Sequence, residues 1–291
     1  MFWQQLVNGL ALGSTYALIA LGYTMVYGII QLINFAHGEI YMMGAFVALF
    51  CVLVLKLNVF IAMILAMAFC MLLGVVIEFV AYRPLRKSSR LSALISSIGV
   101  SIFLSTLALL IFGADAKGFP DNSFPLIQFK IGSAEFSSLQ LLIIGVSALL
   151  MLALEFIVHK TKIGKAMRAT SQDYNTAALM GVNVNLIISF TFALGSSLAA
   201  AGGVLVGIYF NAVSFNMGLL AGLKAFAAAV LGGIGSIPGA MLGGIILGVI
   251  EVFGVAIGYS SYRDALAFAI LVIVLLFRPA GLLGLKIQKK V

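Results

Sequence analysis

The sequence has few charged residues, few histidines and few cysteines, and these shortages exclude several classes of protein. Charged residues make up 9% of the 291 residues, whereas hydrophobic residues make up 63%. A soluble domain of this length cannot bury so many Leu, Ile, Val and Phe side chains. The sequence contains no HExxH motif, no GxxxxGK[ST] phosphate-binding loop and no serine elbow with a placed histidine. We therefore expect no catalytic site, no metal site and no ATP bound by this chain itself.

The cysteines and the N-terminus also carry few signals. Cys51 and Cys70 lie in apolar segments without CxxC spacing, which is typical of small buried side chains. The first residues, MFWQQLVNGLAL, have no basic region and no cleavage site. This pattern predicts a first membrane span rather than a signal peptide.

Apolar runs long enough to cross a membrane recur along the chain and predict an all-α, polytopic transmembrane bundle of about eight or nine spans. Helices of this length satisfy their backbone hydrogen bonds in lipid, and the alternation typical of a β-barrel is absent. We expect residues 1–291 to form one transmembrane domain with some broken or re-entrant helices. The expected spans are 8–30, 40–55, 60–81, 92–113, 139–158, 186–208 and 262–278, and a glycine-rich region at 222–257 adds one or two more.

The net charge of +8 indicates topology rather than binding to nucleic acid. Most Lys and Arg residues lie in 82–91, in 159–185 and in the tail from 278 onwards. Cytoplasmic loops of membrane proteins carry an excess of these residues, so we expect these segments and the C-terminus in the cytoplasm. Alternating spans then place the N-terminus outside. The long loop 114–138 is expected outside as well, as a partner surface or a lid, with a short hairpin in LIQFKIGSAEF.

Small residues recur at every fourth position in several spans, for example Gly9, Gly13 and Ala17. This spacing lets helix backbones approach closely in lipid, for static packing or for sliding during transport. ALGS occurs at 11–14 and again at 193–196, in spans expected to run in opposite directions. The recurrence is that of an inverted repeat or, alternatively, a chance recurrence of four small residues.

Polar residues at membrane depth form a candidate translocation path, because such groups are costly unless they face a cavity or a partner. In NFAHGEIYMMG, residues 34–44, Gly38 permits an unwound turn between two apolar runs, which would line the path. The alternative is a turn at the membrane interface that caps the second helix, with Glu39 in its first turn favoured by the helix dipole. Glu251 is either a residue of this path or a packed, hydrogen-bonded carboxylate with a structural role. The candidate path residues are Asn34, His37, Gly38, Glu39 and Glu251.

The polar segment 159–185 is predicted to contact something in water. Asp173 is a suitable N-cap for a short helix, and Gly181 suits its C′ position. Ala177, Ala178, Leu179 and Met180 would form its apolar face. Such a helix fits a groove of a partner domain or, alternatively, lies on anionic lipid.

Four segments resemble the permease subunits of branched-chain amino acid ABC importers. They are 8–46, which contains NGLALGSTYALIALGY; 164–205, which contains GKAMRATSQDYNTAALMGVNVN; 225–251, which contains AVLGGIGSIPGAMLGG; and 277–284, FRPAGLLG. The resemblance implies the ABC importer permease fold, and it implies that 159–185 is a coupling loop that meets an ATPase. The residues it assigns to coupling are Arg168, Asp173, Ala177, Ala178, Leu179, Met180 and Gly181.

The resemblance also implies partners and cargo. We expect a second homologous permease, two cytosolic subunits that bind ATP and Mg, and a periplasmic or tethered binding protein, all at the bacterial inner membrane. Branched-chain amino acids are the expected cargo, and related amino acids, short amides or urea stay open. The rival hypothesis is a self-contained channel or ion-coupled carrier that uses Glu251 and the turn at 34–39.

Overall fold

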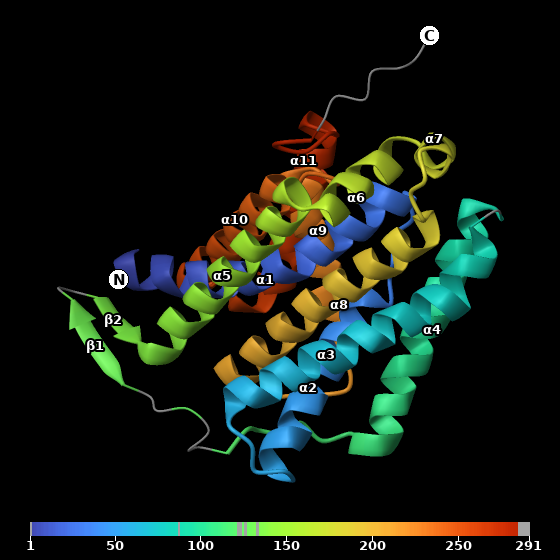
Figure 1. The fold of residues 1–291 in the computed structure, drawn as a ribbon. Helices are drawn as coiled ribbons and strands as arrows, with labels where there is room; N and C mark the ends of the chain where they lie inside the picture. Colours follow the sequence, from blue (N-terminus) through green and yellow to red (C-terminus); the bar gives the residue numbers. More distant parts are fainter. Residues whose placement is uncertain (1, 87, 121–123, 125–126, 132–133, 285–291) are drawn as a thin grey trace.

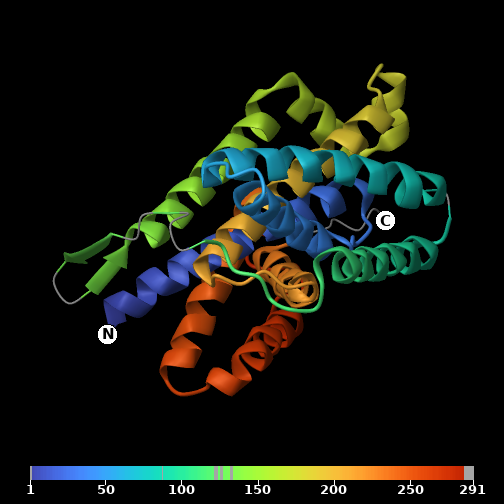
Figure 2. The same ribbon diagram turned by 90° about the horizontal axis from the view of Figure 1, so that it is seen from below.

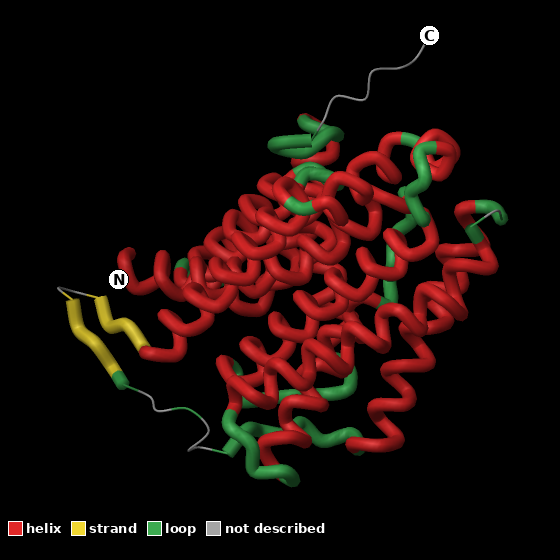
Figure 3. Tube along the Cα trace, in the orientation of Figure 1, coloured by secondary structure: helices red, strands yellow, loops and turns green. Residues whose placement is uncertain are grey.

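A computed structural model describes residues 2–86, 88–120, 124, 127–131 and 134–284, which form a helical bundle with one small hairpin (Figures 1 and 3). Seven helical segments in the described part are long and apolar enough to cross a membrane. They are α1 (Phe2–Ile30), α3 (Val59–Ile77) with its continuation to Leu85, α4 (Arg90–Phe112), α5 (Ser138–Lys160), α8 (Val184–Tyr209), α10 (Ile237–Ala256) and α11 (Arg263–Phe277) with the preceding 3₁₀ turn η3 (Ser260–Tyr262). Two shorter apolar helices, α2 (His37–Leu53) and α9 (Met217–Gly232), complete the bundle and agree with the expected number of spans.

The broken region 222–257 is two helices joined by a tight turn. Gly233 and Gly235 have φ of 106° and 94°, values that L side chains rarely adopt. Ser236 then caps α10 by accepting a hydrogen bond from the Gly239 backbone N–H at 3.2 Å. Gly235 therefore belongs to the turn and not to either helix.

The small-residue stripes of α1 and α10 pack against each other, as their spacing predicts. A Cβ added to Gly13 would lie 2.7 Å from the Ile245 Cα, and one added to Gly244 would lie 2.4 Å from the Ala17 backbone nitrogen. Since Cβ atoms do not approach backbone atoms so closely, these positions have to be glycine for the two helices to be in contact.

The helix order supports the inverted repeat suggested by the ALGS recurrence. The long helix α1, a non-helical connection 31–36 and the short helix α2 precede α3, and α8, the connection 210–216 and α9 precede α10 in the same order. α1 and α8 are antiparallel, because Gly22 approaches Gly195 while Gly202 lies near the Thr15 carbonyl. α1 packs on α10, and α8 packs on α3 through Gly74 and Ser196.

The short hairpin expected in the external loop is present in the structure. Strands β1 (Gln128–Ile131) and β2 (Ala134–Ser137) pair antiparallel, with Phe129 opposite Phe136. Ser137 then starts α5 with a capping box that it shares with Gln140. The preceding part of the loop is held by backbone pairing of Lys117 with Val213. Pro125 lies outside the described residues.

The hairpin and the N-terminus lie at one end of the bundle, and the basic connections lie at the other (Figures 1 and 2). At this second end, called the basic end below, lie α6 (Lys162–Gln172) and α7 (Tyr174–Leu179). The π-helix η1 (Glu78–Tyr82) and the 3₁₀ turn η2 (Arg83–Leu85) extend α3 to the same end. Lys286, Lys289 and Lys290 of the basic tail lie outside the described residues.

Candidate functional site

The connection between α5 and α8 folds as two short helices, of which only the second was expected. α6 begins after Thr161, whose hydroxyl accepts a hydrogen bond from the Gly164 backbone N–H at 3.0 Å. α7 begins after Asp173, whose carboxylate accepts from the Thr176 backbone N–H at 2.9 Å. Both contacts satisfy backbone donors that the first turn of a helix leaves unpaired. The predicted N-cap role of Asp173 is confirmed.

The end of α7 is also as predicted. Gly181 has a φ of 83°, and its N–H donates to the Ala178 carbonyl at 3.0 Å. The Val182 N–H donates to the Ala177 carbonyl at 3.1 Å, which completes a Schellman motif. This geometry places Gly181 at the C′ position and turns the chain sharply towards α8.

The apolar residues of α7 do not share one face. Ala177 is buried against the bundle, whereas the Leu179 and Met180 side chains are 88% and 81% exposed. Ala178 is also exposed. Four successive residues cannot share a face, because neighbours on a helix are about 100° apart. Ala178, Leu179 and Met180, called the apolar tip below, project away from the protein.

Two side chains fasten this segment to the bundle. Arg168 Nη1 donates to the Val158 carbonyl near the end of α5, and Tyr174 Oη donates to the Ile29 carbonyl near the end of α1. Burial raises the pKa of the Tyr174 phenol above its usual value, against the opposing effect of nearby Arg86, so the donor stays protonated. The apolar tip is therefore connected through α6 and α7 to two long helices.

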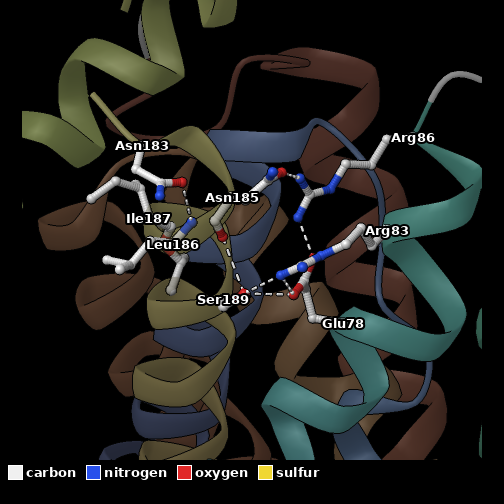
Figure 4. A network of polar contacts seen from close by, with 9 residues as sticks. Glu78, Arg83, Arg86, Asn183, Asn185, Leu186, Ile187 and Ser189 are labelled. Carbon is white, nitrogen blue, oxygen red and sulfur yellow. Dashed lines mark hydrogen bonds and ion pairs between the residues drawn. The ribbon is translucent and has the colours of Figure 1, made fainter. Parts of the chain in front are cut away.

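A network of charged and polar side chains joins the end of α3 to the start of α8 (Figure 4). The Glu78 carboxylate is fully buried and pairs with Arg83 at 3.1 Å and with Arg86. Ser189 accepts from Arg83 at 2.9 Å and donates to Glu78 at 2.6 Å. Arg86 also donates to the Asn185 side-chain carbonyl at 2.6 Å. A buried carboxylate with two guanidinium partners is strongly coupled to both.

This network places α3, α8 and α7 in one continuous chain of contacts. Asn183 lies between α7 and α8 and caps α8 by accepting from the Leu186 backbone N–H at 3.2 Å (Figure 4). Glu78 and Arg83 are five residues apart in the sequence. Ser189 and Asn185 are about one hundred residues away, so no local pattern could have identified them.

The residues at 34–39 are buried inside the bundle. Asn34, His37 and Glu39 are 2%, 1% and 2% exposed, so their side chains face the interior of the bundle. The Asn34 carbonyl oxygen accepts from the Tyr82 hydroxyl at 3.0 Å. The Glu39 carboxylate lies in the first turn of α2, as expected, and accepts from Ser101 at 3.2 Å. None of these three residues lines either of the two cavities described below.

Gly38 was expected to permit an unwound turn, but it lies within a helix. It is the second residue of α2, and the non-helical connection is 31–36. A Cβ at Gly38 would lie 2.2 Å from the Gly218 carbonyl oxygen and 3.0 Å from the Gly222 Cα. Gly38 is therefore required for the close approach of α2 to the start of α9.

Glu251 belongs to a separate group of charged and polar side chains, whose members are remote from one another in the sequence. Its Oε1 accepts from Lys224 at 3.0 Å, from Tyr16 at 3.2 Å and from Arg263. Lys224 also pairs with Asp264 at 2.6 Å. Lys224 lies in the middle of α9 and is buried. The packed structural carboxylate is thus confirmed, and its partners come from α1, α9 and α11.

A cavity of about 380 Å³ lies beside these charges, lined by residues from α1, α2, α8, α9, η3 and α11. Lys224, Arg263 and Asp264 line it, and Glu251 lies behind them. A smaller cavity, of about 90 Å³, lies between α1, α5, α6 and α10 at the basic end, with Arg168 in its wall. No group of three or more His, Cys, Asp or Glu side chains suited to a metal ion occurs among the described residues.

Comparison with known sequences agrees with the resemblance. Residues 5–275 match the family model described as the permease component of the branched-chain amino acid transport system. The chain is 46% identical to the high-affinity branched-chain amino acid transport system permease protein BraD of Pseudomonas aeruginosa, over 97% of this chain and 96% of that protein. It is 44% identical to the permease protein LivH of Escherichia coli K12 over the same shares of the two chains.

A solved structure supports the fold. A chain of PsaBC from Streptococcus pneumoniae in complex with Fab superposes with a TM-score of 0.52 and 16% sequence identity. The match covers 94% of this chain and 91% of that chain. At this identity the likeness concerns the arrangement of helices alone.

Proposed function

Because this chain belongs to the family of branched-chain amino acid transport permease components, we propose that it forms part of the path by which an ATP-driven importer moves branched-chain amino acids into the cytoplasm. It is a multi-pass membrane protein, and we place it in the bacterial inner membrane. The basic end faces the cytoplasm, since loops rich in Lys and Arg remain there, and the N-terminus and the hairpin face outside.

The apolar tip is the observation that carries the proposal. Leu179 and Met180 expose large apolar side chains at the basic end, where water rather than lipid surrounds them in this orientation. A short helix with such a tip fits an apolar groove of a partner. We propose that the partner is a cytosolic ATP-binding subunit, which holds the ATP and Mg, and that a second ATP-binding subunit serves a second homologous permease.

The contacts around α7 support a route for force. α7 is fastened to α1 through Tyr174 and leads through the Asn183 cap into α8. α8 is joined to α3 by the network around Glu78. Movement of a subunit bound at the apolar tip would then displace helices that pack against both halves of the inverted repeat. This is a coupling role for Arg168, Asp173 and the segment 177–181.

At the other end, the hairpin and the described residues 113–120 offer a surface for a substrate-binding protein, which we propose as the source of the cargo. Its selection of branched-chain amino acids precedes any selection by this chain. The alternative cargoes, other small amino acids or amides, are distinguished by competition in the same assay.

Reconstitution tests the proposal. The chain is incorporated in liposomes with its second permease and the two ATP-binding subunits, and the binding protein is added outside. We expect uptake of labelled leucine only with ATP inside the liposomes and binding protein outside. Uptake by this chain alone, driven by an ion gradient without nucleotide, would instead support the self-contained carrier.

A further inference from the structure

The cavity of about 380 Å³ is remote from the coupling segment and has the size of a small-molecule site, for which roughly 300–1,000 Å³ is usual. Its wall includes Ser260 and Ser261, between α10 and α11, and Arg263 and Asp264 at the start of α11, at the end opposite the basic end. In the orientation proposed above, this is the end at which a substrate arrives from outside.

The polar part of the wall holds charges of both signs at fixed positions. Lys224 is only 7% exposed and is held between Glu251 and Asp264, at 3.0 and 2.6 Å. Arg263 is fixed by Glu251 on one side and by the Phe210 ring, 5.6 Å from its guanidinium carbon, on the other. Glu251 does not line the cavity, but it pairs with both cations and so orients them. Lys224 and Arg263 each have further N–H donors that are not used by Glu251.

The charge balance of this group selects among ligands. Two cations and two carboxylates cancel, so a ligand with a net charge would leave an uncompensated charge in a partly buried site. A zwitterion adds no net charge and presents both signs. Its carboxylate matches the guanidinium of Arg263 and the ammonium of Lys224, and its ammonium matches Asp264, whose side chain is 51% exposed.

The rest of the wall is apolar. Leu12, Val206, Leu220 and Ala221 come from α1, α8 and α9 and contribute aliphatic side chains. The hydroxyls of Ser260 and Ser261 lie at the same cavity, from η3. A cavity with charged and aliphatic groups in its wall complements an α-amino acid with an aliphatic side chain.

We infer that this cavity is a transient binding site for the zwitterionic amino acid on its way through the permease, with Arg263 and Lys224 for the carboxylate, Asp264 for the ammonium and the aliphatic wall for the side chain. The inference rests on the proposed function, since it places that cargo in a specific site. Glu251, a candidate path residue, acts here as a positioning residue for the two cations.

Protection of an introduced cysteine tests the site directly. Ser261→Cys is made in a Cys51→Ala, Cys70→Ala background, and the complete transporter is reconstituted without nucleotide or binding protein. The rate at which a membrane-impermeant maleimide labels this chain is measured after the chain is separated from its partners. We expect millimolar leucine to slow labelling about tenfold, which corresponds to occupancy of about 90% of the sites. Ala212→Cys, at the same end but outside the cavity, is the control and should not respond.

Two truncated ligands separate recognition of the zwitterion from simple filling of the cavity. The carboxylate 4-methylpentanoate lacks the ammonium, and 3-methylbutylamine lacks the carboxylate. We expect neither to protect the wild-type site. In Asp264→Asn the wall gains a net positive charge, so protection should shift from leucine to 4-methylpentanoate, while Asp264→Glu should behave as the parent.

The outcomes distinguish this inference from the proposed function. Absence of protection by leucine, or equal protection by 4-methylpentanoate in the parent, overturns the site even when ATP-dependent leucine uptake is normal. Absence of ATP-dependent leucine uptake by the unmodified transporter overturns the proposed function, whatever the labelling shows. Leucine-specific protection that is lost in Asp264→Asn and kept in Asp264→Glu supports the assignment.

Discussion

Gly38 and Gly218, the second residues of α2 and α9, are in direct backbone contact. A Cβ on Gly38 would lie 2.2 Å from the Gly218 carbonyl oxygen, and one on Gly218 would lie 2.7 Å from the Gly38 carbonyl oxygen. The two short helices of the inverted repeat therefore meet at their N-termini. Glu39 lies at the same junction, with its Oε2 atom 2.5 Å from the Cβ position of Gly218.

Substitution of Gly38 by alanine tests whether this contact holds the two halves together. A methyl group there has no space unless the backbone moves, and overpacking of this kind costs roughly 1–3 kcal/mol. We expect Gly38→Ala to lower the thermal stability of the purified protein and to reduce uptake. Stability is measured as the fraction that stays monodisperse after heating in detergent.

Gly99→Ala is the matched control for this substitution. Gly99 lies within α4, and no atom of another helix lies within 4 Å of the position of an added Cβ. Alanine favours a helix over glycine by up to about 1 kcal/mol, so the control should retain or gain stability. Equal loss in both variants would mean that the Gly38–Gly218 contact is not responsible.

The apolar tip gives the second prediction. Leu179→Asp places a charge where the proposed groove of the ATP-binding subunit is apolar, so desolvation of the carboxylate opposes docking. We expect loss of co-purification with the ATP-binding subunits and loss of ATP-dependent uptake, with normal insertion into the membrane. Asn175→Asp, on the exposed part of the same helix, adds the same charge and should leave both measurements near the wild-type values. Normal co-purification of Leu179→Asp would remove the tip from the coupling surface.

The Glu78 network gives the third prediction. Glu78→Gln leaves Arg83 and Arg86 without a buried anionic partner, and loss of one member of a buried ion pair costs roughly 3–5 kcal/mol. Ser189→Ala removes one hydroxyl and should cost only about 0.5–1.5 kcal/mol. We expect the thermal stability to fall in that order. A double variant that is no less stable than Glu78→Gln alone would demonstrate that the two side chains act through the same contact, whereas full additivity would contradict it.

Much of the fold could be predicted from the sequence, because the features that define it depend on residues close together in the chain. Length and hydropathy gave the number of spans, and the spacing of Gly9, Gly13 and Ala17 gave the face that packs on α10. Asp173 and Gly181 marked the ends of α7 because capping uses residues within one turn.

The candidate site was less predictable, because its contacts join residues remote in sequence. Lys224 and Arg263 lie 27 and 12 residues from Glu251 in the sequence, yet both pair with it. Their meeting depends on how α9 and α11 pack on α10, which no local pattern contains. The apolar residues of α7 were identified correctly, but the side that each faces depends on the contacts of α7 with the bundle.

The aliphatic wall of the larger cavity gives the last prediction. Ala221 lines the cavity on α9 and is only partly buried, so a larger side chain can be accommodated there without disrupting the helix. Ala221→Leu removes volume where the side chain of the cargo would lie, and one methylene in an apolar pocket is worth roughly 1–3 kcal/mol. We expect the maximal rate of leucine uptake, measured with saturating loaded binding protein, to fall about tenfold relative to that of the smaller valine. Ala212→Leu makes the same change outside the cavity and should leave the ratio of the two rates unaltered. An equal fall for both amino acids would show that residue 221 affects transport without contacting the cargo, because only direct contact makes the loss depend on the size of the transported side chain.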